Sequence, residues 1–205
     1  MRHSASKALF DHWSSLRQGL FAPDRNDLDP ITLGPILQDV FILGSDIQGE
    51  WHYRVAGTRL TAYAGRELRD ESFLRWWRAA DRLDAKRLVN SSPDHAPLVG
   101  AITGMGADQQ QHDFELLLLP LRHGGRPHLR MIGGLFPFPR TVTRMGICIE
   151  ELGLTSLRSL IPGNADSPVF GREPGNLESI LERRRAFRLI KGGARQGHHG
   201  ERQRV

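Results

Sequence analysis

The stretch that decides the fold is Trp51–Trp77, which reads WHYRVAGTRLTAYAGRELRDESFLRWW. Its first six residues alternate, with the two aromatic side chains and a valine on one side, which predicts a half-buried β-strand. Gly57 supplies a turn after this strand, and Thr58 is a good N-cap for a helix over Arg59–Ala64. A second apolar helical segment begins at Phe73–Trp77. The pattern therefore predicts a strand that feeds a series of short helices.

The sequence on both sides of this block predicts an antiparallel sheet. Short, turn-forming connectors at 104–108 and 123–126 favour hairpins between neighbouring strands. The apolar helical spacing of residues 7–17 indicates an N-terminal amphipathic helix, and residues 79–90 are helical by composition. The expected strands are Asp39–Leu43, Trp51–Ala56, Pro97–Thr103, His112–Leu121 and His128–Phe138.

These elements define an α+β fold, a five-stranded antiparallel sheet with helices on one face, plus an N-terminal helix and an irregular basic C-terminal tail. We expect an N-terminal extension over residues 1–38, a core over 39–140 and a C-terminal extension over 141–205. Within the last segment, Val142–Leu154 is expected to be strand-like and Thr155–Leu160 to form one or two helical turns. The residues beyond Gly192 are expected to be disordered.

Several of these pieces resemble a known family. Tyr53–Leu60 (YRVAGTRL), Gly65–Leu68 (GREL) and the following Phe73-Leu74-x-x-Trp77 are similar to the bacterial single-domain PAS proteins grouped as PAS family 5. The likeness extends upstream to Pro23–Pro30 and downstream to Phe114–Leu121, and covers roughly residues 5 to 140. The resemblance implies a PAS fold and a role in signalling. It implies no particular ligand, because PAS domains as a class bind haem, flavins, small acids or nothing.

The charge of the chain is concentrated in the tail. Of its 28 basic and 23 acidic residues, nine basic and four acidic residues follow from Arg172 onward, so the rest of the chain is neutral. We therefore expect no nucleic acid on the folded body. Binding of a nucleotide or nucleic acid through the tail stays open, because Arg184-x-x-x-Arg188 is similar to the opening of PilZ domains, although too few residues follow it for a PilZ barrel.

The remaining composition limits the compartment and the chemistry. No apolar run is long enough for a transmembrane helix, and the N-terminus lacks the apolar core of a secretory signal, so we expect a cytoplasmic protein. Cys148 is the single cysteine, which excludes an intramolecular disulfide and a metal site built on paired cysteines. Hydrolase, P-loop and zinc-protease signatures are absent, so we expect no enzyme, and no cofactor is assigned.

A ligand, if bound, is expected between the sheet and the helices of residues 58–90. Of the two adjacent tryptophans we expect Trp77 to point inward and Trp76 to cover an edge or a partner. The alternative is that the same aromatic residues simply form the core. The candidate wall is Phe73, Trp77, Leu116, Leu118, Met131 and Gly133, with Arg54 and Thr58 as the polar groups that orient an anion or carbonyl.

The strand around Phe114–Leu121 is apolar on both faces, so a second surface must cover it. That cover is either the N-terminal helix or another protomer, and we expect a homodimer. Glu115 is expected at the rim of this contact, in a salt bridge with Arg54 or Arg130. The candidate interface residues are Leu9, Trp13, Leu117 and Leu119.

The leading functional hypothesis is a cytoplasmic PAS protein that binds a protein partner and senses a small ligand. In this hypothesis, occupancy of the cavity changes the packing of the sheet or the N-terminal helix and so changes affinity for the partner. The rival hypothesis is a structural adaptor whose core is filled by its own side chains. An unfilled cavity with polar groups favours the sensor, and a packed core favours the adaptor.

Overall fold

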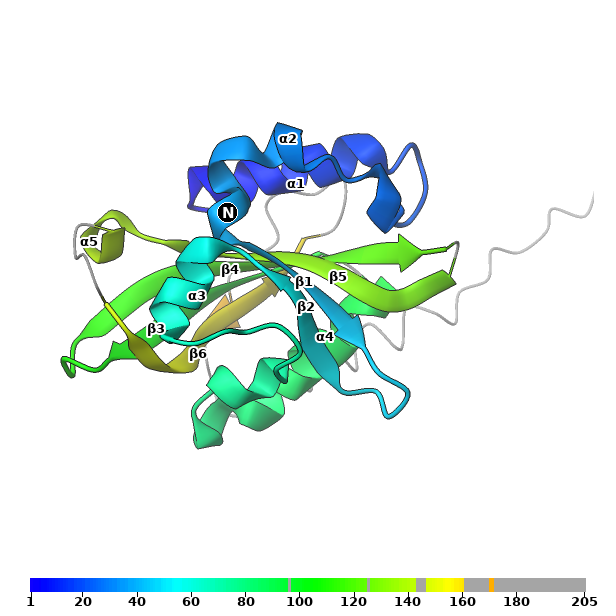
Figure 1. Ribbon diagram of the computed structural model, residues 1–205. Coiled ribbons are helices and arrows are strands. Elements are labelled where there is room, and N and C mark those ends of the chain that lie inside the picture. Colours follow the sequence, from blue (N-terminus) through cyan, green and yellow to red (C-terminus); the bar gives the residue numbers. More distant parts are fainter. Residues whose placement is uncertain (96, 125, 143–146, 161–169, 172–205) are drawn as a thin grey trace, which may run out of the picture. The chain divides into compact units, whose positions relative to one another are not determined.

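A seven-stranded sheet in the order β2-β1-β5-β4-β3-β6-β7 organises the chain, and every paired strand runs antiparallel to its neighbour (Figure 1). The computed structural model describes residues 1–95, 97–124, 126–142, 147–160 and 170–171. The strands are β1 (Val40–Ser45), β2 (Trp51–Ala56), β3 (Leu98–Gly106), β4 (Gln111–His123), β5 (Arg126–Pro137), β6 (Ile149–Ser159) and β7 (Phe170–Gly171).

Helices and helical turns lie on both sides of this sheet. Figure 1 shows α1 and α2 on one side and α4 on the other. We call the side that faces α4 the inner face and the side that faces α1 the outer face. The α-helices are α1 (Ser4–Leu16), α2 (Pro30–Leu33), α3 (Thr58–Ala64), α4 (Arg82–His95) and α5 (Pro139–Val142), and the 3-10 turns are η1 (Arg25–Asp27), η2 (Gly34–Asp39), η3 (Phe73–Trp76) and η4 (Ala79–Asp81).

All five expected strands are present, and the helical segments stand between the second and third of them, so the α+β fold class is confirmed. The sheet is wider than expected because β6 pairs along the length of β3, from Gly106 with Ile149 to Leu98 with Ser159. The expectation of helical turns over Thr155–Leu160 was wrong, since these residues continue the strand to Ser159. The sheet therefore extends past the boundary expected at residue 140.

The outer face of the sheet is covered by the chain's own N-terminal helix. Leu9 and Trp13 of α1 are fully buried, and the indole N–H of Trp13 donates to the carbonyl of Pro120 in β4 at 2.8 Å. Leu117 and Leu119 are fully buried in the same apolar cluster. Of the two covers expected for this strand, the helix is therefore the one observed. The four candidate interface residues form a core within one chain, so they are not an exposed surface for a second protomer.

The helix ends differ in detail from expectation. The imidazole of His3 is the N-cap of α1, and its Nδ1 accepts from the amide of Ala5 at 3.1 Å. Thr58 is the first residue of α3 and Gly57 is its N-cap. Glycine is required at position 57, since an added Cβ would lie against the main chain of residues 37 and 38. Helix α4 continues to His95, beyond the helical segment expected over residues 79–90.

Candidate functional site

The space between the inner face and the α3–α4 helices is filled by side chains. A cavity among the described residues there has a volume of about 10 Å³. That volume is near the minimum for a single water molecule. Its walls are entirely apolar or aromatic and are formed by Phe41, Tyr53, Leu60, Phe73, Trp76, Trp77, Leu116, Leu135 and Leu152.

Aromatic side chains account for most of this filling. The rings of Phe41 and Tyr53 meet edge to face with centroids 5.5 Å apart, and the ring of Phe73 lies 5.6 Å from that of Trp77. The ring of Phe41 occupies the space over Gly133, where an added Cβ would collide with it. The absence of a side chain at Gly133 therefore makes room for the ring of Phe41 from the neighbouring strand. That ring fills the space that a ligand would otherwise occupy.

Both tryptophans of the Trp76–Trp77 pair are buried, with 1% of each residue exposed. Trp76 ends η3 and donates its indole N–H to the carbonyl of Ile149 at 2.9 Å. Trp77 leaves the turn with extended dihedral angles and forms a bridge to Leu152 of β6. Because the backbone changes from helical to extended between them, both indoles enter the core. The expected role of Trp76 at an edge was therefore wrong.

The expected ligand wall is assembled only in part. Phe73, Trp77 and Leu116 line the small cavity, while Leu118 and Met131 are fully buried without lining it. The two polar groups lie elsewhere: Thr58 lines a groove on the outer face, and the Nε of Arg54 lies over Gly44, where an added Cβ would be 2.9 Å from it. The sheet separates both from the small cavity. A ligand site with these eight residues is not present in this conformation.

Two buried carboxylates hold helical segments to the sheet. Asp81 of η4 is fully buried and accepts from the amide of Leu154 in β6 at 2.9 Å and from the guanidinium of Arg78. Glu115 of β4, 4% exposed, accepts from the amides of Arg2 at 2.7 Å and His3 at 3.1 Å. The salt bridge expected between Glu115 and Arg54 or Arg130 was therefore wrong, since Glu115 binds the main chain just before α1.

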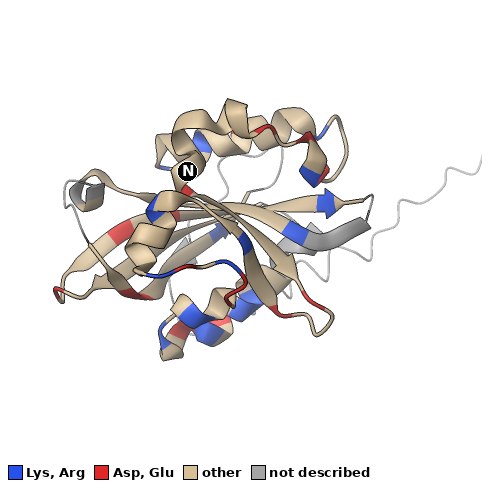
Figure 2. Cartoon of the chain, in the orientation of Figure 1, with Lys and Arg blue, Asp and Glu red and all other residues tan. Residues whose placement is uncertain are grey.

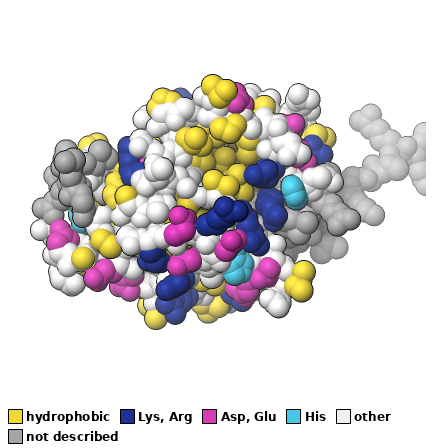
Figure 3. Space-filling view, viewed as in Figure 1, with side chains coloured by type: hydrophobic (Ala, Val, Ile, Leu, Met, Phe, Trp, Pro, Cys, Tyr) yellow, Lys and Arg dark blue, Asp and Glu magenta, His cyan; other side chains and the backbone are white. Residues whose placement is uncertain are grey.

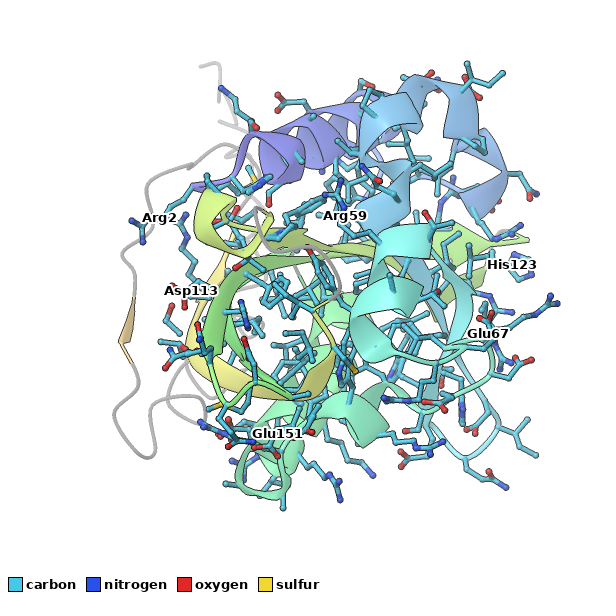
Figure 4. The ribbon with its side chains drawn as sticks, turned by 60° about the vertical axis from the view of Figure 1, so that its left-hand side comes forward. Arg2, Arg59, Glu67, Asp113, His123 and Glu151 are labelled. Carbon is cyan, nitrogen blue, oxygen red and sulfur yellow. The ribbon has the colours of Figure 1, made fainter. Side chains whose placement is uncertain are left out.

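A third buried carboxylate, Asp39, has a shifted pKa. It is 4% exposed and pairs with Arg59 of α3, labelled in Figure 4, at 3.0 Å. Burial raises the pKa of Asp39 to about 6, and the positive charge of Arg59 only partly opposes this. The pair holds the start of β1 to α3.

A second hollow among the described residues lies on the outer face, where none was expected. It is a groove of about 600 Å³ between the segment that contains η1, α2 and η2 and the strands β1 and β2. Figure 3 shows it as a hollowed apolar area bordered by Lys and Arg side chains. Its wall includes Arg25, Leu33, Leu37, Ile42, Val55 and Ile132. The sequence offered one signal for it, the run of apolar residues before and within β1 that exceeds what the inner face can bury.

Charges elsewhere follow the expected neutral balance. Figure 2 shows Lys, Arg, Asp and Glu interspersed over the described chain, without a large region of one sign. Among the residues that the structure describes, no group of three or more His, Cys, Asp or Glu is placed to hold a metal ion. No helix in the described ranges is long and apolar enough to cross a membrane. The Arg184-x-x-x-Arg188 motif lies outside the described residues.

The antiparallel sheet with short helices between its second and third strands, together with the helix-covered inner face, is consistent with a PAS-like fold. Comparison with protein families matches residues 1–136 to the family described as PAS domain. That range is well over half of the 205 residues, and the chain therefore belongs to the PAS domain family. A search of curated proteins finds no match to the sequence. PAS membership indicates a signalling or sensory role, and PAS domains commonly mediate protein interactions.

Proposed function

We propose that this chain is a cytoplasmic PAS signalling protein that acts by binding a protein partner, without catalytic activity and without a ligand in its helix–sheet interior. The observation that carries the proposal is the filled interior, where nine side chains leave a cavity of only about 10 Å³. Pockets that take small molecules usually enclose about 300–1,000 Å³. The filled interior therefore supports the adaptor hypothesis over a ligand sensor of the usual PAS kind.

The polar composition of the interior supports the same proposal. Ligand sites usually combine an apolar wall with a few polar groups that orient the ligand. Here the cavity wall has one hydroxyl, from Tyr53, and the two indole N–H groups of Trp76 and Trp77. Trp76 already donates to Ile149, so it is not available to a ligand. Arg54 and Thr58, the groups expected to orient an anion, lie on the other side of the sheet.

The test is native mass spectrometry of the full chain freshly purified from cells, compared with a Trp77→Phe variant. We expect the mass of the 23.1 kDa polypeptide, alone or with a protein partner, and no adduct whose retention depends on Trp77. Trp51→Phe is the matched control, because Trp51 is also buried but donates to Asn90 at the edge of the sheet, away from the cavity wall. A stoichiometric organic adduct that Trp77→Phe removes and Trp51→Phe retains would overturn the proposal.

A further inference from the structure

The outer-face groove has an apolar wall that the fold leaves partly open to solvent. Leu37 of η2 is 41% exposed and Val55 of β2 is 44% exposed, and both line the groove. Ile42 and Ile132 form its floor on neighbouring strands, opposite one another in the register of β1 and β5. The groove thus combines an apolar wall with partial exposure to solvent, as contiguous apolar interaction surfaces do. The volume of about 600 Å³ lies within the range of small-molecule pockets.

Three arginines lie on the same face of the sheet as this groove, and one of them belongs to its wall. Arg25 lines the groove itself. Arg54 and Arg130 meet over Gly44, two residues along β1 from Ile42 and therefore on the same face of the sheet. A Cβ added to Gly44 would lie 2.5 Å from Nη1 of Arg130 and 2.9 Å from Nε of Arg54. Because Gly44 has no side chain, it leaves room for the two guanidinium groups to lie together.

The three cations repel one another. Burial, followed by the positive charges of Arg54 and Arg25, lowers the pKa of Arg130. Two carboxylates lie near these arginines, one beside Arg54 in space and one two residues from Arg25 in sequence. Asp70 accepts from Nη1 of Arg54 at 2.9 Å, but its side chain is 64% exposed, and Asp27 uses an oxygen to accept from the amide of Asp24.

One donor of this cluster is buried and unsatisfied. The Nε of Arg54 has no hydrogen-bond partner among the described residues, although the outer nitrogen of the same guanidinium binds Asp70. An unsatisfied buried donor costs free energy that an oxygen acceptor would recover. Guanidinium groups bind the two oxygens of a carboxylate with particular geometric fit. The cluster therefore favours a carboxylate beside the apolar groove.

We propose that the outer-face groove binds a single-chain amphipathic carboxylate, with its acyl chain along Ile42, Val55 and Leu37 and its carboxylate at the arginine cluster. Charge complementarity favours an anion as the occupant over the chain's own C-terminal tail, since from Arg172 onward that tail carries nine basic and four acidic residues. This site is separate from the filled interior, so it does not depend on the function proposed above.

Dodecanoate is the probe, titrated below its micelle concentration into the full chain by isothermal calorimetry at about pH 8, where the carboxylate is ionised. We expect saturable binding with one site. Dodecyltrimethylammonium has the same chain without the negative charge, and butyrate has the charge without the long chain, so both should bind at least about tenfold more weakly. Absence of saturation, or equal binding of the cationic amphiphile, would overturn the proposal.

Two variants with matched controls locate the site. Val55→Glu places a negative charge on an exposed wall of the groove and should weaken dodecanoate binding about tenfold or more, whereas Leu83→Glu, 60% exposed on α4, should leave it unchanged. Arg25→Gln should weaken binding, and Lys86→Gln on α4 should not. Thermal unfolding of each variant checks that it is folded. Equal binding by Val55→Glu and wild type would overturn the proposal.

A membrane surface could also present acyl chains with anionic heads. Co-sedimentation with phosphatidylglycerol vesicles distinguishes it from the free acid. Vesicle binding without saturable binding of monomeric dodecanoate would overturn the proposal in favour of a lipid surface.

Discussion

Replacement of Trp13 by alanine tests whether the N-terminal helix is an integral part of the fold. Trp13 is fully buried against the outer face, and its indole N–H donates to the carbonyl of Pro120 at 2.8 Å. A buried aromatic side chain removes about 150–250 Å² from water, which at about 25 cal/mol per Å² corresponds to about 4–6 kcal/mol. Partial collapse of the site reduces this, so we expect a loss of about 3–5 kcal/mol in the free energy of unfolding.

The assay is urea denaturation followed by circular dichroism and tryptophan fluorescence. A loss of this size is a large part of the about 5–15 kcal/mol that stabilises a typical domain, so the midpoint should fall markedly. The control is Asp11→Ala, at an exposed position of the same helix, for which we expect a change within about 0.5 kcal/mol. Trp13→Phe should lie between them, since it keeps most of the apolar contact but loses the hydrogen bond.

Light scattering completes the experiment. Loosening of α1 in Trp13→Ala exposes Leu117 and Leu119, so this variant should self-associate more than the wild type. If Trp13→Ala were as stable as Asp11→Ala and its light scattering were unchanged, α1 would not cover the sheet in solution, and the arrangement described above would be refuted.

Three further predictions concern the buried residues. The folded pKa of Asp39, about 6, lies above its ordinary value of 3.8, so the folded protein binds a proton more tightly than the unfolded chain. The free energy of unfolding should therefore fall by about 3 kcal/mol as the pH rises from 3.8 to about 6. In urea unfolding, Asp39→Asn should flatten this decline, and an unchanged slope would contradict the raised pKa. Gly133→Ala should cost about 1–3 kcal/mol because its methyl would overlap the ring of Phe41; an unchanged melting temperature would mean that the interior has spare room. Asp81→Ala should lower the free energy of unfolding by about 1–3 kcal/mol and speed hydrogen exchange at the amide of Leu154. Asp81→Asn keeps an acceptor oxygen and should speed this exchange less. Equal exchange rates in the two variants would show that the hydrogen bond from Leu154 to Asp81 does not protect this amide.

The positions of the strands could be predicted because the signals are local. Alternating side chains and turn-forming connectors mark β1 to β5 within a few residues, and the glycine after Ala64 ends α3 in the left-handed conformation, as expected of such a residue. The sixth strand was missed in part because Thr155–Leu160 has no strong alternation of its own. It becomes a strand because β3 offers it an edge to pair with.

The site could not be predicted because it depends on pairing between distant residues. The register shifts between Ile42 and Leu43, so that Ile42 pairs with Val55 and Leu43 with Tyr53, and Arg54 is the extra residue of a bulge. Alternation alone places Val55 on the same side as Tyr53, yet Tyr53 enters the inner core and Val55 lines the outer groove. Sequence likewise indicates aromatic residues near the cavity but not that Phe41 packs over Gly133 and fills it.

The connection between α1 and β4 also has a consequence for the order of synthesis. The hydrogen bond from Trp13 to Pro120 joins residues 107 apart in sequence, so α1 leaves the ribosome long before the strand that it covers. At about 5–20 residues per second, that delay is several seconds, far longer than helix formation or chain collapse. Throughout this interval the apolar side of α1 has no native acceptor. The nascent chain therefore presents Leu9 and Trp13 to chaperones until β4 emerges, and docking of α1 becomes a late step in folding.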